Sequence, residues 1–255
     1  MKTKKLLGIF FLFLCTITLV SCGDDEKQEI YSLSFEKGYY ERPLLGAKNI
    51  PVRGGNRDYT VTVQNTDVLS INIDLSSPIG MGNLVVKPKQ KGETTVTVKD
   101  NVTNETVNLK IKIVDSYLNL KVAHPAQVPY SGGENLFFIN NSDRDFYLFD
   151  EKMEKKECTG NYQFLIKNST CYMILNFDKE LNDKSTYEYN ISNTSERMFT
   201  LIEILLGVDW NMKADLINRS TRSASPVIMN AVDTETNLTQ YFVAGSNDIP
   251  ENILD

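Results

Sequence analysis

The chain has 255 residues, of which 41% are hydrophobic and 24% charged, so it is neither a disordered protein nor a multi-pass membrane protein. Its formal net charge of −6 argues against nucleic acid as a partner, because phosphates demand a basic surface. One His and four Cys exclude haem sites and large zinc clusters, and we expect neither a metal nor a cofactor.

The first 21 residues are expected to be a lipoprotein signal peptide. Three lysines among the first five residues precede an uncharged run, residues 6–20, which is shorter than the about 20 residues of a membrane-spanning helix. Residues 19–22 read LVSC and resemble a bacterial lipobox. The resemblance implies that the thiol of Cys22 is acylated, that the chain is cut before it, and that the outer membrane holds the lipid. A plain secretory peptide with a chance Cys is the alternative.

Residues 22–30 form an acidic tether. Cys22 is followed by GDDEK, which resembles the surface-export signal of Bacteroidota lipoproteins. The resemblance implies a lipid-anchored protein of the cell outer membrane that faces outward. A merely solvated tether on a periplasm-facing protein is the alternative.

Charge is unevenly divided along the rest of the chain. Residues 31–115 carry 11 basic and 9 acidic side chains, whereas residues 116–255 carry 12 basic and 20 acidic ones. This difference indicates two domains, with a boundary near Asp115-Ser116, where the regular alternation of apolar residues stops.

Residues 31–115 are predicted to form a β-sandwich. Apolar and polar residues alternate through residues 107–113, which is typical of a strand with one buried face. Similar short runs lie at 33–35, 50–52, 59–63, 69–73, 84–86 and 94–98. Gly, Pro, Ser and Asn clusters separate them, so about seven short strands are expected.

Part of this region resembles a known family. Residues 84–113, with a turn at Lys91-Gly92 and a strand over Thr94–Val98, resemble the C-terminal half of bacterial Ig-like domains of group 2 type. The resemblance implies an Ig-like sandwich that serves as a spacer or adhesive module, with no catalytic residues.

Residues 116–255 are predicted to form a second β-rich domain, either a sandwich or a meander, so the whole chain is expected to be all-β. Candidate strands lie at 117–122, 136–140, 146–149, 162–166, 171–177, 187–191, 227–231 and 240–243. Residues 195–206 have a pattern compatible with a helix capped by Ser195, but the neighbouring strands favour a strand there.

The second domain is rich in aromatic residues. It holds 17 of them, against five in residues 31–115. Some must form the core, and others could stack on sugar rings. Trp210, between Asp209 and Asn211, is the candidate ligand-binding residue, because the two neighbours would add hydrogen-bonding groups beside a flat ring. Packing in the core or at its rim is the ordinary alternative for this Trp.

Few other residues suggest chemistry. Cys158 and Cys171 are a candidate disulfide, which would stabilise the fold by roughly 3 kcal/mol; two unpaired thiols are the alternative. Asn141, Asp143 and Asp145 have the spacing of the start of a calcium loop but lack its Gly and Glu. His124 is expected in a surface loop, and no sequence motif supplies a nucleophile for it.

These features predict a non-enzymatic, lipid-anchored envelope protein. We expect it to bind or adhere to an extracellular ligand, either a glycan or a surface protein, through the second domain. One alternative is a small glycoside hydrolase that uses two carboxylates. The other is a structural subunit that pairs its sheet edges with a partner, for which a long unpaired edge strand would be the sign.

Overall fold

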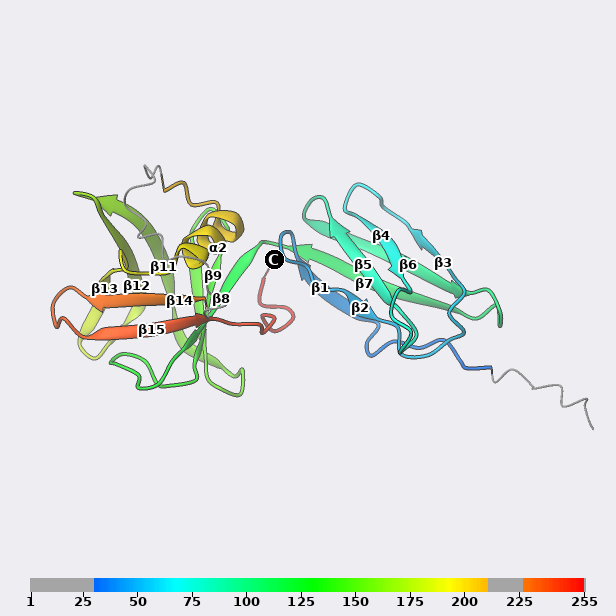
Figure 1. The fold of residues 1–255 in the computed structure, drawn as a ribbon, viewed down its shortest axis with the longest axis horizontal. Helices are drawn as coiled ribbons and strands as arrows, with labels where there is room; N and C mark the ends of the chain where they lie inside the picture. Colours follow the sequence, from blue (N-terminus) through cyan, green and yellow to red (C-terminus); the bar gives the residue numbers. More distant parts are fainter. Residues whose placement is uncertain (1–29, 211–226, 255) are drawn as a thin grey trace, which may run out of the picture.

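A computed structural model describes residues 30–210 and 227–254, apart from the side chains of residues 157 and 158. The signal peptide, Cys22 and Asn211 therefore lie outside the described residues. The described chain is mostly β-structure, as predicted, and forms two units that lie side by side (Figure 1).

The first unit contains a four-stranded and a three-stranded sheet. The larger has the order β1 (Tyr39–Pro43), β7 (Thr106–Val114), β6 (Gly92–Asp100) and β3 (Tyr59–Val63). The smaller has the order β2 (Ile50–Pro51), β5 (Asn83–Pro88) and β4 (Leu69–Asp74). Only β1 and β7 pair in parallel; the other neighbours are antiparallel.

Both sheets contribute to one hydrophobic core. Val96 and Val98 of β6 and Leu109 and Ile111 of β7 are fully buried, while the residues between them face outward. They meet side chains of the smaller sheet, such as Leu84. The alternation in the sequence thus reflects one buried and one solvated face of each strand.

The second unit is a closed barrel of eight antiparallel strands. They are β8 (Tyr117–Val122), β9 (Asn135–Ile139), β10 (Asp145–Phe149), β11 (Lys155–Lys167), β12 (Thr170–Leu181), β13 (Lys184–Asn190), β14 (Ile228–Asp233) and β15 (Thr239–Ala244). Each strand pairs with the next in sequence, and β15 closes on β8. Of the two expected arrangements, the meander is therefore right and the sandwich is wrong.

Aromatic side chains fill the barrel. An eight-stranded barrel is just wide enough to be filled by side chains. Ten of the 17 aromatic residues of this unit are buried in the barrel core, and rings such as Phe138, Phe146 and Tyr162 contact one another inside. The aromatic content that suggested stacking on sugars is explained mainly by this core.

One end of the barrel is covered by α2 (Glu196–Leu206). The strand expected over these residues is wrong. Met198, Ile202 and Leu206 are buried at a spacing of four residues, which places them on one face of a helix. Gly207, with φ of +63°, ends the helix in the left-handed conformation that favours glycine.

A C-terminal segment, residues 245–254, leaves β15 and runs between the two units (Figure 1). Its Ile249 and Leu254 are buried with Val114 of β7 and with Tyr117 and Phe137 of the barrel. The Lys112 ammonium also donates a 2.8 Å hydrogen bond to the Leu254 carbonyl. The segment therefore joins the first unit to the outer face of the barrel.

Within the described ranges, no helix has the length and apolar character needed to cross a membrane.

Candidate functional site

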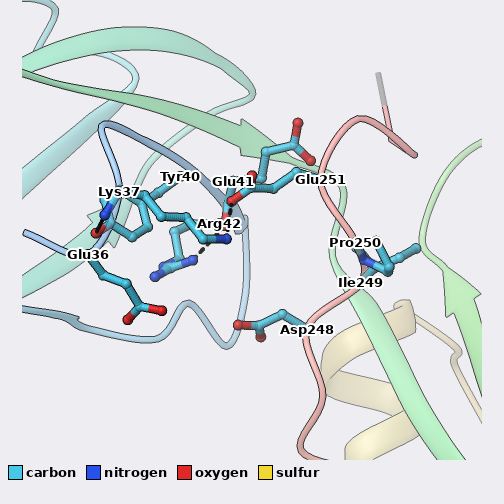
Figure 2. Close-up of a pocket in the computed structure, with 9 residues that line it drawn as sticks. All are labelled: Glu36, Lys37, Tyr40, Glu41, Arg42, Asp248, Ile249, Pro250 and Glu251. Carbon is cyan, nitrogen blue, oxygen red and sulfur yellow. Dashed lines mark hydrogen bonds and ion pairs between the residues drawn. The ribbon is translucent and has the colours of Figure 1, made fainter. Parts of the chain in front are cut away.

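A polar cleft lies where the first unit meets the C-terminal segment (Figure 2). Its volume is about 430 Å³, within the usual range for small-molecule sites. We call it the junction cleft; it is lined by Glu36, Lys37, Tyr40, Glu41, Arg42, Asp248, Ile249, Pro250 and Glu251.

Ion pairs link the two walls of the junction cleft. The Lys37 ammonium lies 3.1 Å from a Glu251 carboxylate oxygen, and the Lys48 ammonium lies 2.9 Å from Asp248. All four side chains are partly exposed, so each pair contributes at most about 1 kcal/mol to stability. The two ion pairs therefore determine where charges lie in the cleft but contribute little to the stability of the junction.

Glu41 is the most buried charged residue of the cleft, with 6% of its surface exposed. One carboxylate oxygen accepts hydrogen bonds from the Tyr39 hydroxyl (2.6 Å) and from the Asn252 amide (3.1 Å). The other oxygen is buried and has no hydrogen-bond partner among the described residues. Burial, and then the bond to Glu41, raises the pKa of Tyr39, so its phenol remains a donor to this carboxylate. A buried acceptor without a donor is costly.

Arg42 gives the cleft a fixed cationic wall. Its guanidinium donates to the carbonyl oxygens of Lys48 (2.9 Å) and Glu41 (2.8 Å). It also lies over the Tyr40 ring, 5.1 Å from the ring centre. These two hydrogen bonds and the ring contact hold the guanidinium in place, so it has little freedom to reorient toward a ligand.

Glu36 and Asp248 point toward each other from opposite sides of the cleft (Figure 2). Glu36 pairs with Arg53 at 2.9 Å, and the hydrogen bond and charge of Arg53 hold the pKa of Glu36 below its ordinary value. The Glu36 side chain is therefore an ionised acceptor at neutral pH rather than a proton donor.

The cleft as a whole offers more acceptors than donors. The carboxylates of Glu36, Asp248 and Glu251 line it and are partly exposed, whereas its Lys and Arg side chains already bind a carboxylate or backbone carbonyls. Such a surface suits a polar ligand that brings several hydrogen-bond donors, as hydroxyl-rich molecules do.

A smaller hollow of about 180 Å³ lies beside it, between the loop after β1 and the barrel. Leu45, Leu201 and Leu205 line it together with Asn119, whose buried side-chain oxygen has no hydrogen-bond partner among the described residues. Its mainly apolar walls are the contact surfaces of the two units.

Trp210 is not an exposed platform, which corrects the expected binding role. Its ring is 5% exposed and lies edge-on to Phe199 and Phe164, with centroid distances of 5.0 and 5.7 Å. Its indole N–H donates to the Phe199 carbonyl at 3.3 Å. Asp209 beside it is exposed, and Asn211 lies outside the described residues.

The expected disulfide between Cys158 and Cys171 is also wrong, because the geometry of the strands keeps the two residues apart. The β11–β12 hairpin turns after Lys167, so Cys171 lies opposite Ile166. Cys158 is eight residues farther along β11, roughly 26 Å away at the rise of a strand. A disulfide needs Cα atoms within about 7 Å. Cys171 is buried on the inner side of the barrel wall.

The remaining polar candidates have structural roles. Asn141 and Asp145 bind each other: the amide donates to the carboxylate at 2.7 Å, and the Asp145 N–H donates back at 3.0 Å. Among the described residues no group of His, Cys, Asp or Glu is arranged to hold a metal ion. His124 is exposed in the loop between β8 and β9, as expected.

Sequence reasoning missed the residues of the junction cleft. Glu36, Glu41 and Arg42 are separated from Asp248 and Glu251 by about two hundred residues, and only folding brings them together. No local motif marks either group, so no signal in a single sequence could have paired them.

Comparisons with known proteins give little further information. No protein family and no curated protein matches the chain. The structure titled "Structure of the S-layer protein SbsC, domains 5-6" is 12% identical, with a TM-score of 0.28, and covers 64% of this chain and 90% of its own. Domains 4–9 of SbsC are also 12% identical, with a TM-score of 0.29, covering 85% and 31%. Scores this low carry no argument about fold or function.

Proposed function

We propose that the mature protein is a lipid-anchored protein of the bacterial outer membrane that faces outward and binds an extracellular ligand without catalysis. The LVSC sequence at residues 19–22 and the acidic residues after Cys22 support this anchoring. The start of the described chain, dark blue in Figure 1, lies on the side of the first unit away from the barrel. A lipid on Cys22 would therefore place the first unit next to the membrane and the barrel farther out.

The observation that carries the binding proposal is the junction cleft. It has the volume of a small-molecule site, both the first unit and the C-terminal segment line it, and it presents the partly exposed carboxylates of Glu36, Asp248 and Glu251. We place the ligand there rather than at Trp210. A glycan is the most concrete ligand, because its hydroxyl groups would supply donors to the carboxylates.

Glycoside hydrolysis is the less favoured function. A hydrolase needs one carboxyl group that keeps its proton near neutral pH, which requires a raised pKa. In the cleft, Arg53 lowers the pKa of Glu36. The other described carboxyl groups with a clear shift, those of Asp74, Asp100 and Asp233, also have lowered pKa values.

A glycan array probed with the mature chain tests this proposal. We expect retention of a subset of polar glycans, and recovery of the bound glycan intact, by mass spectrometry, after prolonged incubation. Release of shortened products would favour the hydrolase instead. Retention of no glycan at all would overturn the glycan version and leave a surface-protein ligand as the next to test.

The anchor has its own test in the living cell. Cys22→Ala should abolish incorporation of a palmitate analogue, because no other thiol follows a small residue at the end of the apolar run. Labelling that persists in this variant would contradict the anchoring.

A further inference from the structure

The first unit has four edge strands, and one of them lacks the usual protection. Edges are normally blocked by charges, Pro or bulges, because their free backbone groups otherwise pair with other chains. β1 carries two charged residues and a Pro, the two-residue β2 ends in Pro51, and β4 ends in Asp74. β3 reads YTVTV, without charge, Pro or Gly.

The hydrogen bonds to β6 show which backbone groups of β3 are free. The Asn101 amide donates to the Asp58 carbonyl at 2.8 Å, and the Gln64 amide donates to the Thr95 carbonyl at 2.9 Å. In an antiparallel ladder every second residue bonds to the same neighbour. Residues 58, 60, 62 and 64 therefore face β6.

The alternate residues of β3 face the other way. The N–H and C=O groups of Tyr59, Val61 and Val63 point away from β6, and in the described part of the chain β3 pairs with no other strand. In Figure 1 β3 lies at the rim of the first unit, on the side away from the barrel. A second strand could approach it there.

We propose that β3 pairs antiparallel with β3 of a second copy of this chain, on a two-fold axis that passes by Val61. In this register Val61 faces Val61 of the second copy, and Tyr59 faces Val63. All the outward backbone groups then meet, which allows about six hydrogen bonds between the copies.

The side chains fit this register as well. Thr60 would lie opposite Thr62 on the exposed face, a pair that is favourable across strands. Just outside the strand, Asp58 would lie opposite Gln64, so no like charges meet. The sequence of β3 is thus complementary to itself, which is why we commit to a second copy rather than to a strand of another protein.

Membrane anchoring would favour this association. A contact of five residues is small for a stable dimer in dilute solution. Copies tethered through Cys22 to one membrane would meet at a much higher effective concentration. We therefore expect pairing of the full lipidated chain on a membrane and much weaker pairing in solution.

Cysteine cross-linking tests both the pairing and its register. Lipidated Thr60→Cys and Thr62→Cys chains are placed on vesicles together or separately and oxidised, with the wild type as the background. Residues opposite each other in a pair without mutual hydrogen bonds have Cα atoms about 4.5 Å apart, close enough for a disulfide. We expect at least ten-fold more covalent dimer from the mixture than from either variant alone. Equal yields would overturn the register.

Two further variants separate pairing from folding. Val61→Pro removes an outward N–H without touching the bonds to β6 and should lower the mixed cross-link at least ten-fold. Thr62→Lys added to the Thr60→Cys chain, and Thr60→Lys added to the Thr62→Cys chain, keep the cysteine pair but place a lysine opposite a lysine, and should do the same. Adding one lysine per chain to the barrel instead, by Ser185→Lys in both cysteine chains, should leave the yield unchanged. Loss of the cross-link in this control as well, or no loss with the lysines at positions 60 and 62, would contradict the proposal.

Discussion

At the scale of single residues, Trp210 shows how composition can mislead. A lone Trp between polar neighbours suggested a ligand platform, yet its ring is enclosed by Phe199 and Phe164, in agreement with the alternative of core packing. Asp209 is exposed and yet says little about the ring beside it, because adjacent residues can face opposite ways.

Replacing Trp210 therefore measures stability rather than binding. Trp210→Ala should lower the free energy of unfolding by about 3–5 kcal/mol, since it leaves a cavity in the barrel core. Trp210→Phe, which keeps a ring but loses the hydrogen bond to Phe199, should cost less. Urea denaturation gives both values. A Trp210→Ala protein of wild-type stability that no longer binds its ligand would restore the platform interpretation.

Asp100 is the best-bonded buried carboxylate of the first unit. It is 0% exposed and accepts hydrogen bonds from the backbone and side chain of Asn56 (2.7 and 2.9 Å) and from the amides of Val102 (2.9 Å) and Thr103 (3.3 Å). Burial alone would raise the pKa of Asp100, but these bonds hold it below its ordinary value.

Asp100→Asn should lower the free energy of unfolding by about 1–3 kcal/mol at pH 7, because an amide cannot accept all these bonds. A carboxyl group with a lowered folded-state pKa stabilises the fold above its unfolded pKa of about 3.9 and loses this effect as the pH falls through the folded value. The difference between wild type and variant should therefore shrink as the pH falls below about 4. Denaturation curves at pH 7 and pH 3 check this, and a constant difference would contradict it.

At the scale of elements, the C-terminal segment is the piece that unites the two units. Ile249→Asn should weaken its packing against Val114 and Tyr117 by about 2–4 kcal/mol. Hydrogen exchange of residues 245–254 should then become faster, with the interior of the barrel unchanged. Glu251→Gln, which removes only an exposed ion pair, is the control and should have little effect. Unchanged exchange in Ile249→Asn would mean that the segment does not hold the units together.

The elements also show what a single sequence can predict. Strands such as β6 and β7 were predictable because alternation follows directly from the geometry of a strand. The apolar residues of α2 recur at a spacing of four residues, which is compatible with a helix, but the neighbouring strands led us to predict a strand. The supposed disulfide failed because the position of the β11–β12 turn, and not the number of residues between two Cys, sets which residues meet. The junction cleft is formed by segments that are distant in the sequence, so a single sequence could not predict it.

At the scale of the whole molecule, the chain builds a sheet pair and a closed barrel, which meet through the C-terminal segment and the loop after β1. The barrel has no free edge, since β15 pairs with β8, and its interior is filled by side chains. We therefore place recognition outside the barrel, at the junction cleft and at the edge of β3.

The most direct test of the central claim is the affinity of the junction cleft for a ligand. The best ligand of the array is titrated calorimetrically into the mature chain and into the Glu36→Ala, Asp248→Ala variant, which removes the two carboxylates that point toward each other across the cleft. Glu180→Ala with Glu203→Ala, at exposed positions of the barrel unit, is the matched control. We predict that the dissociation constant of the cleft variant is at least ten-fold larger than that of the wild type. The affinity of the control variant and the melting temperatures of both variants should be unchanged. Equal affinity of all three proteins would contradict a binding site in the junction cleft.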